Sequence, residues 1–332
     1  MKRFCHNSMI FVRYMFYSSL ISIAWQQSSL AQGQAPVPQV AEYGYKILNR
    51  VNAQNDGKLR RVLASQYVNE SGVTQIYLRV LRQQPDNNWI SFLEKYELNS
   101  SGGVVFLQES QINDYREIFP PEKDPIKGMA VVGNEVIVLV GSKINDIVRQ
   151  KLVFYNKNTL SFIRESAPLL SNGMALSPNP DTASSYPLVM SDFNGNGIRL
   201  MRLDGIQQTT PSTVVVYRGV GTPETKAGKF SAIQIVPQGG DRYKAYGQVW
   251  QSDMVLAWEW SKTNEAQIYR VTDFANFAGF HLEDLYQYDK PIVKSDGFLG
   301  TLSYDANTNN FWITDERFLS LHGVSITPLS KK

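Results

Sequence analysis

The sequence predicts an all-β protein, a β-propeller of about five four-stranded blades, and three observations lead to this prediction. Short runs rich in Val, Ile, Tyr, Phe and Trp recur along the chain, as β-strands require. A pair of such runs joined by a short polar turn returns about five times, roughly every 50 residues, a period typical of repeat architectures. Residues 274–286 are the one stretch with the pattern of a short helix. The five repeated turns lie at residues 99–103, 156–158, 204–205, 261–264 and 305–309.

The predicted strands fall into five groups along the chain. The first comprises residues 59–68, 73–81, 89–98 and 104–108, and the second 129–132, 135–140, 148–155 and 160–164. The third comprises 173–176, 186–190, 198–203 and 213–217, and the fourth 230–236, 243–250, 254–260 and 266–271. The fifth comprises 292–294, 298–304 and 311–314, followed by extra strand-like residues at 318–327. In the second group, Gly133 and Asn134 fit a two-residue hairpin turn.

The surplus strand at the carboxyl end suggests how such a fold closes. In a closed propeller one blade is commonly completed by strands from both chain ends, because this removes an open sheet edge. We therefore expect residues 45–51 and 324–328 to complete one blade together. A tandem pair of β-sandwiches is the alternative fold, since sandwiches also have short strands at regular spacing. The near-regular period of the repeats favours the propeller.

The first 31 residues have the features of an export signal. Lys2 and Arg3 precede an apolar stretch at residues 14–25, and small residues lead to an expected cleavage after Ala31. An uncleaved membrane anchor is the alternative, but the apolar stretch is shorter than the about 20 residues that span a bilayer. We therefore expect an exported protein, periplasmic or at the cell surface or extracellular, with no integral membrane span after cleavage. Residues 32–42 predict a flexible leader, and residues 43–332 the propeller domain.

Composition excludes several classes of function. The one cysteine, Cys5, lies in the predicted signal, so the mature chain has neither disulfides nor thiol chemistry. Removal of Lys2, Arg3 and Arg13 leaves 33 − 3 = 30 basic residues against 30 acidic ones, and the formal net charge of +3 falls to zero. No basic stripe that would neutralise phosphates is present, so nucleic acid is not an expected partner.

One repeat carries a family resemblance. Gly-Met-Ala-Val-Val at residues 128–132 and Ile-Val-Leu-Val-Gly-Ser at 137–142 are followed by Leu-Val-Phe-Tyr-Asn-Lys-Asn-Thr-Leu-Ser-Phe at 152–162. This order of two strands and a turn resembles the bacterial Delta-60 propeller repeats. Asn158 and Thr159 stand where that family favours a glycine turn. The resemblance implies a propeller and implies no reaction.

The sharpest local motif is Ser-Asp-Phe-Asn-Gly-Asn-Gly at residues 191–197. Side-chain oxygens at alternate positions can converge on a hard cation while the last glycine makes a tight turn, so calcium is the predicted ion. The segment is also similar to the calcium loop of FG-GAP propeller repeats, although Leu200 stands where that family has an aspartate. A hairpin turn without metal is the alternative, because Asn and Gly tolerate positive φ. The predicted metal ligands are Asp192, Asn194, Asn196 and Ile198.

No catalytic residue is predicted. The mature chain has two histidines, His281 and His322, and no Gly-x-Ser-x-Gly nucleophile elbow. A glycosidase needs two carboxylates that face each other across a sugar, but aspartates at strand ends also serve as turn residues. Trp250, beside polar residues at a strand end, and Asp253 are the predicted ligand-binding residues. The strand-end aspartates are Asp192, Asp253, Asp273, Asp296, Asp305 and Asp315.

The sequence therefore predicts an exported, non-catalytic binding or adhesive module whose protein or carbohydrate ligand lies at one face of the propeller. One alternative is a carbohydrate-active hydrolase that uses paired strand-end aspartates on the same scaffold. Another is a structural scaffold of an envelope assembly, which a broad apolar surface patch would favour.

Overall fold

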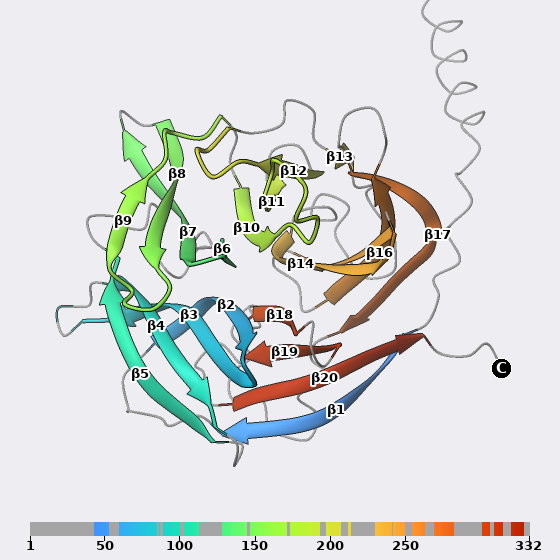
Figure 1. Ribbon diagram of the computed structural model, residues 1–332, viewed down its shortest axis with the longest axis horizontal. Coiled ribbons are helices and arrows are strands. Elements are labelled where there is room, and N and C mark those ends of the chain that lie inside the picture. The colour runs from blue at the N-terminus through green and yellow to red at the C-terminus, as the bar shows by residue number, and fades with distance from the viewer. Residues whose placement is uncertain are drawn as a thin grey trace, which may run out of the picture. The chain divides into compact units, whose positions relative to one another are not determined.

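The computed structural model describes residues 43–52, 60–84, 86, 89–99, 103–112, 128–144, 147–170, 173–192, 197–206, 212–213, 230–240, 242–249, 254–262, 269–281, 301–305, 309–314 and 320–328. Within these residues the chain is all-β, and its strands form five four-stranded antiparallel sheets (Figure 1). Neighbouring strands in a sheet are mostly consecutive in the chain, which is the order of a meander. The predicted export signal and leader, residues 1–42, lie outside the described residues.

The sheets follow one another along the chain. The first contains β2 (Arg60–Glu70), β3 (Val73–Gln83), β4 (Trp89–Leu98) and β5 (Val104–Gln111), and the second β6 (Met129–Val132), β7 (Glu135–Ile144), β8 (Ile147–Asn156) and β9 (Phe162–Glu165). The third contains β10 (Gly173–Pro178), β11 (Leu188–Asp192), β12 (Gly197–Met201) and β13 (Ser212–Thr213). The fourth contains β14 (Phe230–Gly239), β15 (Arg242–Val249), β16 (Met254–Lys262) and β17 (Tyr269–His281). The fifth contains β18 (Thr301–Asp305), β19 (Asn310–Thr314), β20 (Ser320–Pro328) and β1 (Tyr43–Asn52).

The fifth sheet joins the two ends of the described chain, as the sequence predicts. Strand β1 pairs with β20 from Tyr43 opposite Pro328 to Asn52 opposite Ser320, with one irregularity between Ile47 and Asn49. Figure 1 shows the blue β1 beside the red β20. The amino-terminal strand is therefore held by the outer edge of β20, which would otherwise be an open edge.

Apolar layers lie between successive sheets. In β7, Val136, Val138 and Val140 pack in a cluster with first-sheet residues, whereas Ile137 and Leu139 pack in a cluster with third-sheet residues. This alternation follows from the two-residue period of a strand. All five side chains are at most 1% exposed, and burial of each contributes about 1.5–3 kcal/mol. The continuous apolar run in the sequence therefore marks a strand that is covered on both faces.

The two-residue turn predicted in the second sheet is confirmed. Val132 pairs with Glu135, and Gly133 between them has a φ of 57°. A positive φ at the first turn residue is typical of a type II′ turn, which glycine adopts without steric strain.

The prediction of a short helix at residues 274–286 is wrong for residues 274–281, which belong to β17. Leu256 of β16 pairs with Gly279, and Met254 pairs with His281. Pairing with β16 supplies backbone partners for residues 278–281, and such tertiary pairing overrides a weak local preference. Residues 282–286 lie outside the described residues.

One edge strand of each sheet, here called its first strand, lies against the first strands of two other sheets. The five first strands are β2, β6, β10, β14 and β18. Strand β2 contacts β6, β6 contacts β10, β10 contacts β14, β14 contacts β18, and β18 contacts β2. Segments far apart in the sequence thereby meet, and the residues between these five strands form the first candidate site.

Candidate functional site

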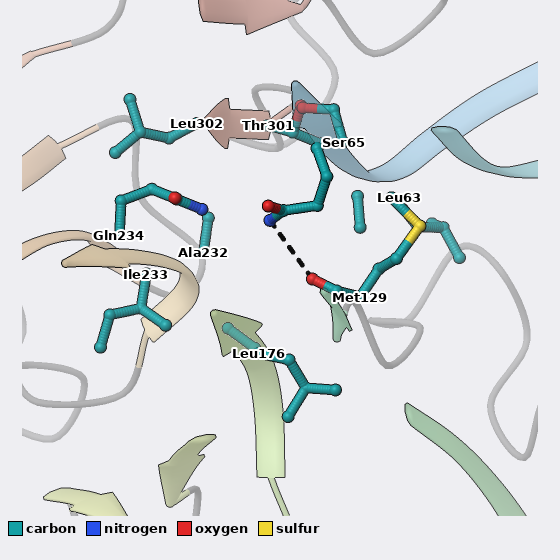
Figure 2. Close-up of a pocket in the computed structure, with 12 residues that line it drawn as sticks. Leu63, Ser65, Met129, Leu176, Ala232, Ile233, Gln234, Thr301 and Leu302 are labelled. Atoms are coloured by element: carbon teal, nitrogen blue, oxygen red, sulfur yellow. Dashed lines mark hydrogen bonds between the residues drawn. The ribbon is translucent and has the colours of Figure 1, made fainter. Parts of the chain in front are cut away.

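A small cavity, here called the axial cavity, lies where the first strands of all five sheets meet (Figure 2). Its wall is mostly aliphatic, with four polar side chains from three of the strands. The volume is about 10 Å³, which is room for about one water molecule. The lining residues are Leu63, Ala64, Ser65, Gln66, Met129, Ala175, Leu176, Ala232, Ile233, Gln234, Thr301 and Leu302.

Hydrogen bonds between sheets fix the polar side chains of the axial cavity. The hydroxyl groups of Ser65 on β2 and Thr301 on β18 are hydrogen-bonded to each other. Gln66 Nε2 donates to the Met129 carbonyl at 3.3 Å, the dashed line in Figure 2. Gln234 Oε1 accepts from the backbone N–H of Tyr304 at 3.4 Å. These groups can bind a small neutral polar molecule, and the described residues of the lining include no carboxylate, imidazole, amine or thiol for acid–base catalysis.

An ion-pair cluster lies within the first sheet, and Arg82 and Glu94 are its buried members. Arg82 on β3 bonds to Glu94 on β4 and to Glu109 on β5, and the Tyr96 hydroxyl donates to Glu94 Oε2 at 2.5 Å. Burial disfavours the charged guanidinium, but the hydrogen bonds and charges of the two glutamates outweigh it and raise the Arg82 pKa. Because every charge here is paired, the cluster serves to hold three neighbouring strands together.

A second cluster of ionisable groups lies between the first and second sheets. The Tyr77 hydroxyl donates to Gln75 Oε1 at 2.6 Å and lies 3.3 Å from the Lys157 carbonyl oxygen. Lys95 Nζ donates to the same carbonyl oxygen at 3.4 Å. The Lys157 ammonium pairs with Glu70. Burial raises the Tyr77 pKa far above its usual value, and burial together with the charge of Lys157 lowers the Lys95 pKa.

Two edge strands expose apolar side chains. On β5, Val105, Phe106 and Leu107 are 45%, 49% and 44% exposed, and on β9, Phe162 and Ile163 are 57% and 43% exposed. These five residues are here called the apolar edge. Strands β5 and β9 are the last strands of the first and second sheets (Figure 1). Several exposed apolar side chains on neighbouring residues mark an interaction site more often than scattered single residues do.

The two halves of the apolar edge have the same local structure. Phe106 pairs with Tyr96 and Phe162 pairs with Tyr155, each aromatic pair edge to face at 5.4 and 6.3 Å between ring centroids. The next residue, Leu107 or Ile163, is a β-bulge in each strand. The sequence contains the signal for this, because Phe-Leu-Gln-Glu-Ser at 106–110 returns as Phe-Ile-Arg-Glu-Ser at 162–166. The apolar edge was nevertheless not predicted, because the repeated segment does not show that each of these strands is the last in its sheet.

The structure brings part of the predicted calcium loop together. Asp192 ends β11, Gly197 begins β12, and the two residues pair with each other across the hairpin. Ile198 follows in β12, opposite Ser191. Asn194 and Asn196 lie outside the described residues. Within the described residues, no three His, Cys, Asp or Glu side chains are grouped so that they could hold a metal ion.

The predicted ligand-binding residues, Trp250 and Asp253, lie outside the described residues, in the connection between β15 and β16. In the described part of the chain, no helix is long and apolar enough to cross a membrane.

Comparison with solved structures shows what the chain is similar to. Myxococcus xanthus glutaminyl cyclase matches with a TM-score of 0.54 and 12% identity, over 88% of this chain and 100% of that chain. The mannosyltransferase MPT-1 from Leishmania mexicana has a TM-score of 0.48 and 9% identity, over 85% and 91% of the two chains. The GH43_1 enzyme from Xanthomonas citri has a TM-score of 0.46 and 10% identity, over 82% and 88%.

No family model and no curated protein sequence matches this chain, so neither the Delta-60 nor the FG-GAP resemblance gains support from a family. The glutaminyl cyclase has a fold of the β-propeller type. At 12% identity, the similarity to the glutaminyl cyclase shows the fold alone. The chain is therefore an all-β protein with a fold of the β-propeller type.

Proposed function

We propose that this chain is an exported, closed five-bladed β-propeller that acts as a binding module. Its partner is a protein that lays an extended segment along the apolar edge. The observation that carries the proposal is the exposure of five apolar side chains on the outer strands of two consecutive sheets. The cyclic contacts of the five first strands, and the pairing of β1 with β20, support the closed propeller.

A side-chain hydrogen bond supports the proposal that the two halves of the apolar edge act together. The Gln108 side chain of β5 donates a hydrogen bond to the carbonyl of Asn158, in the turn that leads into β9. The bulges at Leu107 and Ile163 re-aim these side chains, as bulges at sheet edges commonly do. One extended segment can therefore contact both strands.

The energies of binding favour a partner that also forms main-chain hydrogen bonds over one that makes apolar contacts alone. Covering the exposed half of each of the five side chains gives about 1 kcal/mol per residue. Association costs about 4–15 kcal/mol in lost freedom, so this apolar burial alone holds a partner weakly. Strands β5 and β9 each have one strand neighbour among the described residues, which leaves an outer backbone edge for a strand-like segment. Main-chain hydrogen bonds to these edges supply the remaining affinity.

A selection experiment tests the docking proposal. A library of random linear peptides is displayed on phage and selected on the purified protein, and the enriched peptides are measured by fluorescence polarisation. We expect extended apolar peptides whose affinity falls about tenfold or more in the double variant Phe106→Ser, Phe162→Ser. Ile206→Ser is the matched control, because Ile206 is 53% exposed but follows β12 of the third sheet. Peptides that bind the double variant and the parent protein equally well would contradict the proposal.

Export is a separate part of the proposal and has its own test. Amino-terminal sequencing of the protein recovered from its producing cell is expected to begin at Gln32, directly after the predicted cleavage site. A mature chain that still begins at residue 1 would contradict export by a cleaved signal.

The hydrolytic alternative requires two accessible carboxylates across a sugar site. Of the strand-end aspartates, Asp305 is 5% exposed and so does not offer its carboxylate to a substrate. Hydrolysis of chromogenic glycosides that is lost in Asp253→Asn would favour this alternative over the binding module. The scaffold alternative shares the apolar edge with our proposal, and it differs in requiring a permanent assembly rather than a peptide-competed one.

A further inference from the structure

Two glutamine amides line the axial cavity, and the hydrogen bond of each to a backbone group shows which amide atom is the oxygen and which is the nitrogen. Gln66 Nε2 donates to the Met129 carbonyl, so the Gln66 amide must direct Oε1 elsewhere. Gln234 Oε1 accepts from the N–H of Tyr304, so this amide must direct Nε2 elsewhere. Figure 2 shows the Gln234 amide turned toward the middle of the cavity. One strong acceptor and one strong donor are thus available in the cavity wall.

Both remaining amide atoms are in an environment that demands a partner. Gln66 and Gln234 are each 5% exposed, and both line the cavity. Within the described part of the chain, Gln66 Oε1 and Gln234 Nε2 have no protein partner, yet neither belongs to the fully enclosed polar atoms that lack one. Because both residues line the cavity, we assign these two atoms to its wall. Buried side-chain amides without a partner are rare, because their desolvation is not compensated.

We propose that the axial cavity is a binding site for one structural water molecule. The water donates to Gln66 Oε1 and accepts from Gln234 Nε2, and it thereby links β2 of the first sheet to β14 of the fourth. A volume of about 10 Å³ is at the lower limit for one water and excludes a sugar ring or an amino-acid side chain. The aliphatic wall offers a larger polar ligand nothing, whereas a water needs two to four polar partners.

Two measurements on the purified full-length protein test this site. The first is a high-resolution crystal structure, in which we expect one density peak within about 3.2 Å of both Gln66 Oε1 and Gln234 Nε2. The second is oxygen-17 magnetic relaxation dispersion, which counts long-lived internal waters. We expect the double variant Gln66→Met, Gln234→Met to contain about one such water fewer than the parent protein.

The control is Gln150→Met. Gln150 is 4% exposed and its amide bonds to both backbone polar groups of Gly173, at 2.6 and 2.9 Å, but it does not line the cavity. We expect the number of long-lived waters to be unchanged in this variant, although a buried glutamine is lost in the same way. An unchanged water count in the double variant, or the absence of a peak between the two amides in the parent crystal, would overturn the proposal. If the double variant does not fold, the parent crystal alone decides.

Discussion

Leu160 shows how burial of one side chain stabilises an unfavourable backbone conformation. Its φ is 51°, in the left-handed region, and its side chain is fully buried between the first and second sheets. Asn156 prepares this turn, because its Oδ1 accepts from the N–H groups of Asn158 and Thr159 at 2.8 and 3.0 Å. The sequence predicts a turn here from its asparagines, but not the conformation of Leu160, since leucine has no preference for positive φ.

The strained backbone at Leu160 should reverse the usual order of stability of an alanine and a glycine variant. Leu160→Ala is expected to destabilise the protein by about 2–5 kcal/mol through the loss of buried apolar contacts. Glycine is normally about 0.5–1 kcal/mol worse than alanine in regular structure, but here it relieves about 1–2 kcal/mol of left-handed strain. Leu160→Gly should therefore be at least as stable as Leu160→Ala. Urea unfolding of both variants measures this, and a glycine variant that is clearly the less stable of the two would contradict the account.

The buried phenol of Tyr155 should make the stability of the protein depend on pH in the alkaline range. Burial raises the pKa of Tyr155 from 10.0 to about 12, while the charge of Arg79 acts weakly in the opposite direction. The unfolded chain thus loses its phenolic proton first, so this contribution to stability is complete below pH 10 and is lost as the pH rises to about 12. Tyr155→Phe should leave the free energy of unfolding at pH 7 almost unchanged and should reduce its fall above pH 10. Urea unfolding at both pH values tests this, and an unaltered alkaline slope would be evidence against it.

Between neighbouring sheets, buried polar side chains bond to the backbone of the next sheet. At least one such side chain occurs at each of the five boundaries, in addition to the apolar layers. The bonds join Gln66 to Met129, Gln150 to Gly173, Ser191 to Phe230, Gln234 to Tyr304, and Ser303 to Tyr67. Uncharged polar residues, glutamine and serine, within otherwise apolar strands are therefore part of how the sheets are joined.

Removal of one of these bonds should be costly. Ser191 Oγ accepts from the N–H of Ala175 at 3.0 Å and donates to the Phe230 carbonyl at 2.8 Å, so Ser191→Ala leaves two buried backbone groups without this partner. We expect a loss of about 1–3 kcal/mol in the free energy of unfolding. Ser161→Ala serves as the control, because Ser161 is exposed and should change stability by less than about 0.5 kcal/mol. Equal effects of the two substitutions would show that the boundary bonds are unimportant.

Calcium binding by the loop between β11 and β12 stays a prediction. Asp192 and Gly197 close this hairpin, so a cation held by the loop would rigidify it. Because a ligand that binds only the folded form stabilises it, millimolar calcium should raise the melting temperature of the chelator-treated protein, and Asp192→Ala should abolish the rise. An unchanged melting temperature would make the segment a turn alone.

Elements were predictable from the sequence to the extent that local pattern determines them. The strands of the first two sheets, the turn at Gly133, and the meeting of the chain ends all follow from apolar runs and turn residues. The strand at residues 274–281 could not be predicted from the sequence, because its strand state depends on pairing with β16. The apolar edge could not be predicted either, because exposure depends on which strand is last in its sheet.

At the scale of the whole molecule, the five first strands leave little space between them. Their aliphatic side chains come from segments as distant in sequence as Leu63 and Leu302, so the width of the axial cavity could not be inferred from any local pattern. A cavity of about 10 Å³ is far smaller than the about 300–1,000 Å³ of a typical ligand pocket, so the outer strands are the better candidate for a binding surface. We therefore propose that the partner binds at the apolar edge, whereas the sequence predicted a ligand at one face of the propeller.

Hydrogen exchange tests this central claim most directly. Backbone amides of the protein are followed by mass spectrometry with and without the peptide of highest affinity from the selection described above. We predict that exchange slows in β5 and β9, because a strand-like segment covers their outer backbone groups, and that it stays unchanged in β2 and β14 at the axial cavity. Protection of β2 and β14 without protection of β5 and β9 would contradict the account and return the binding site to the axis.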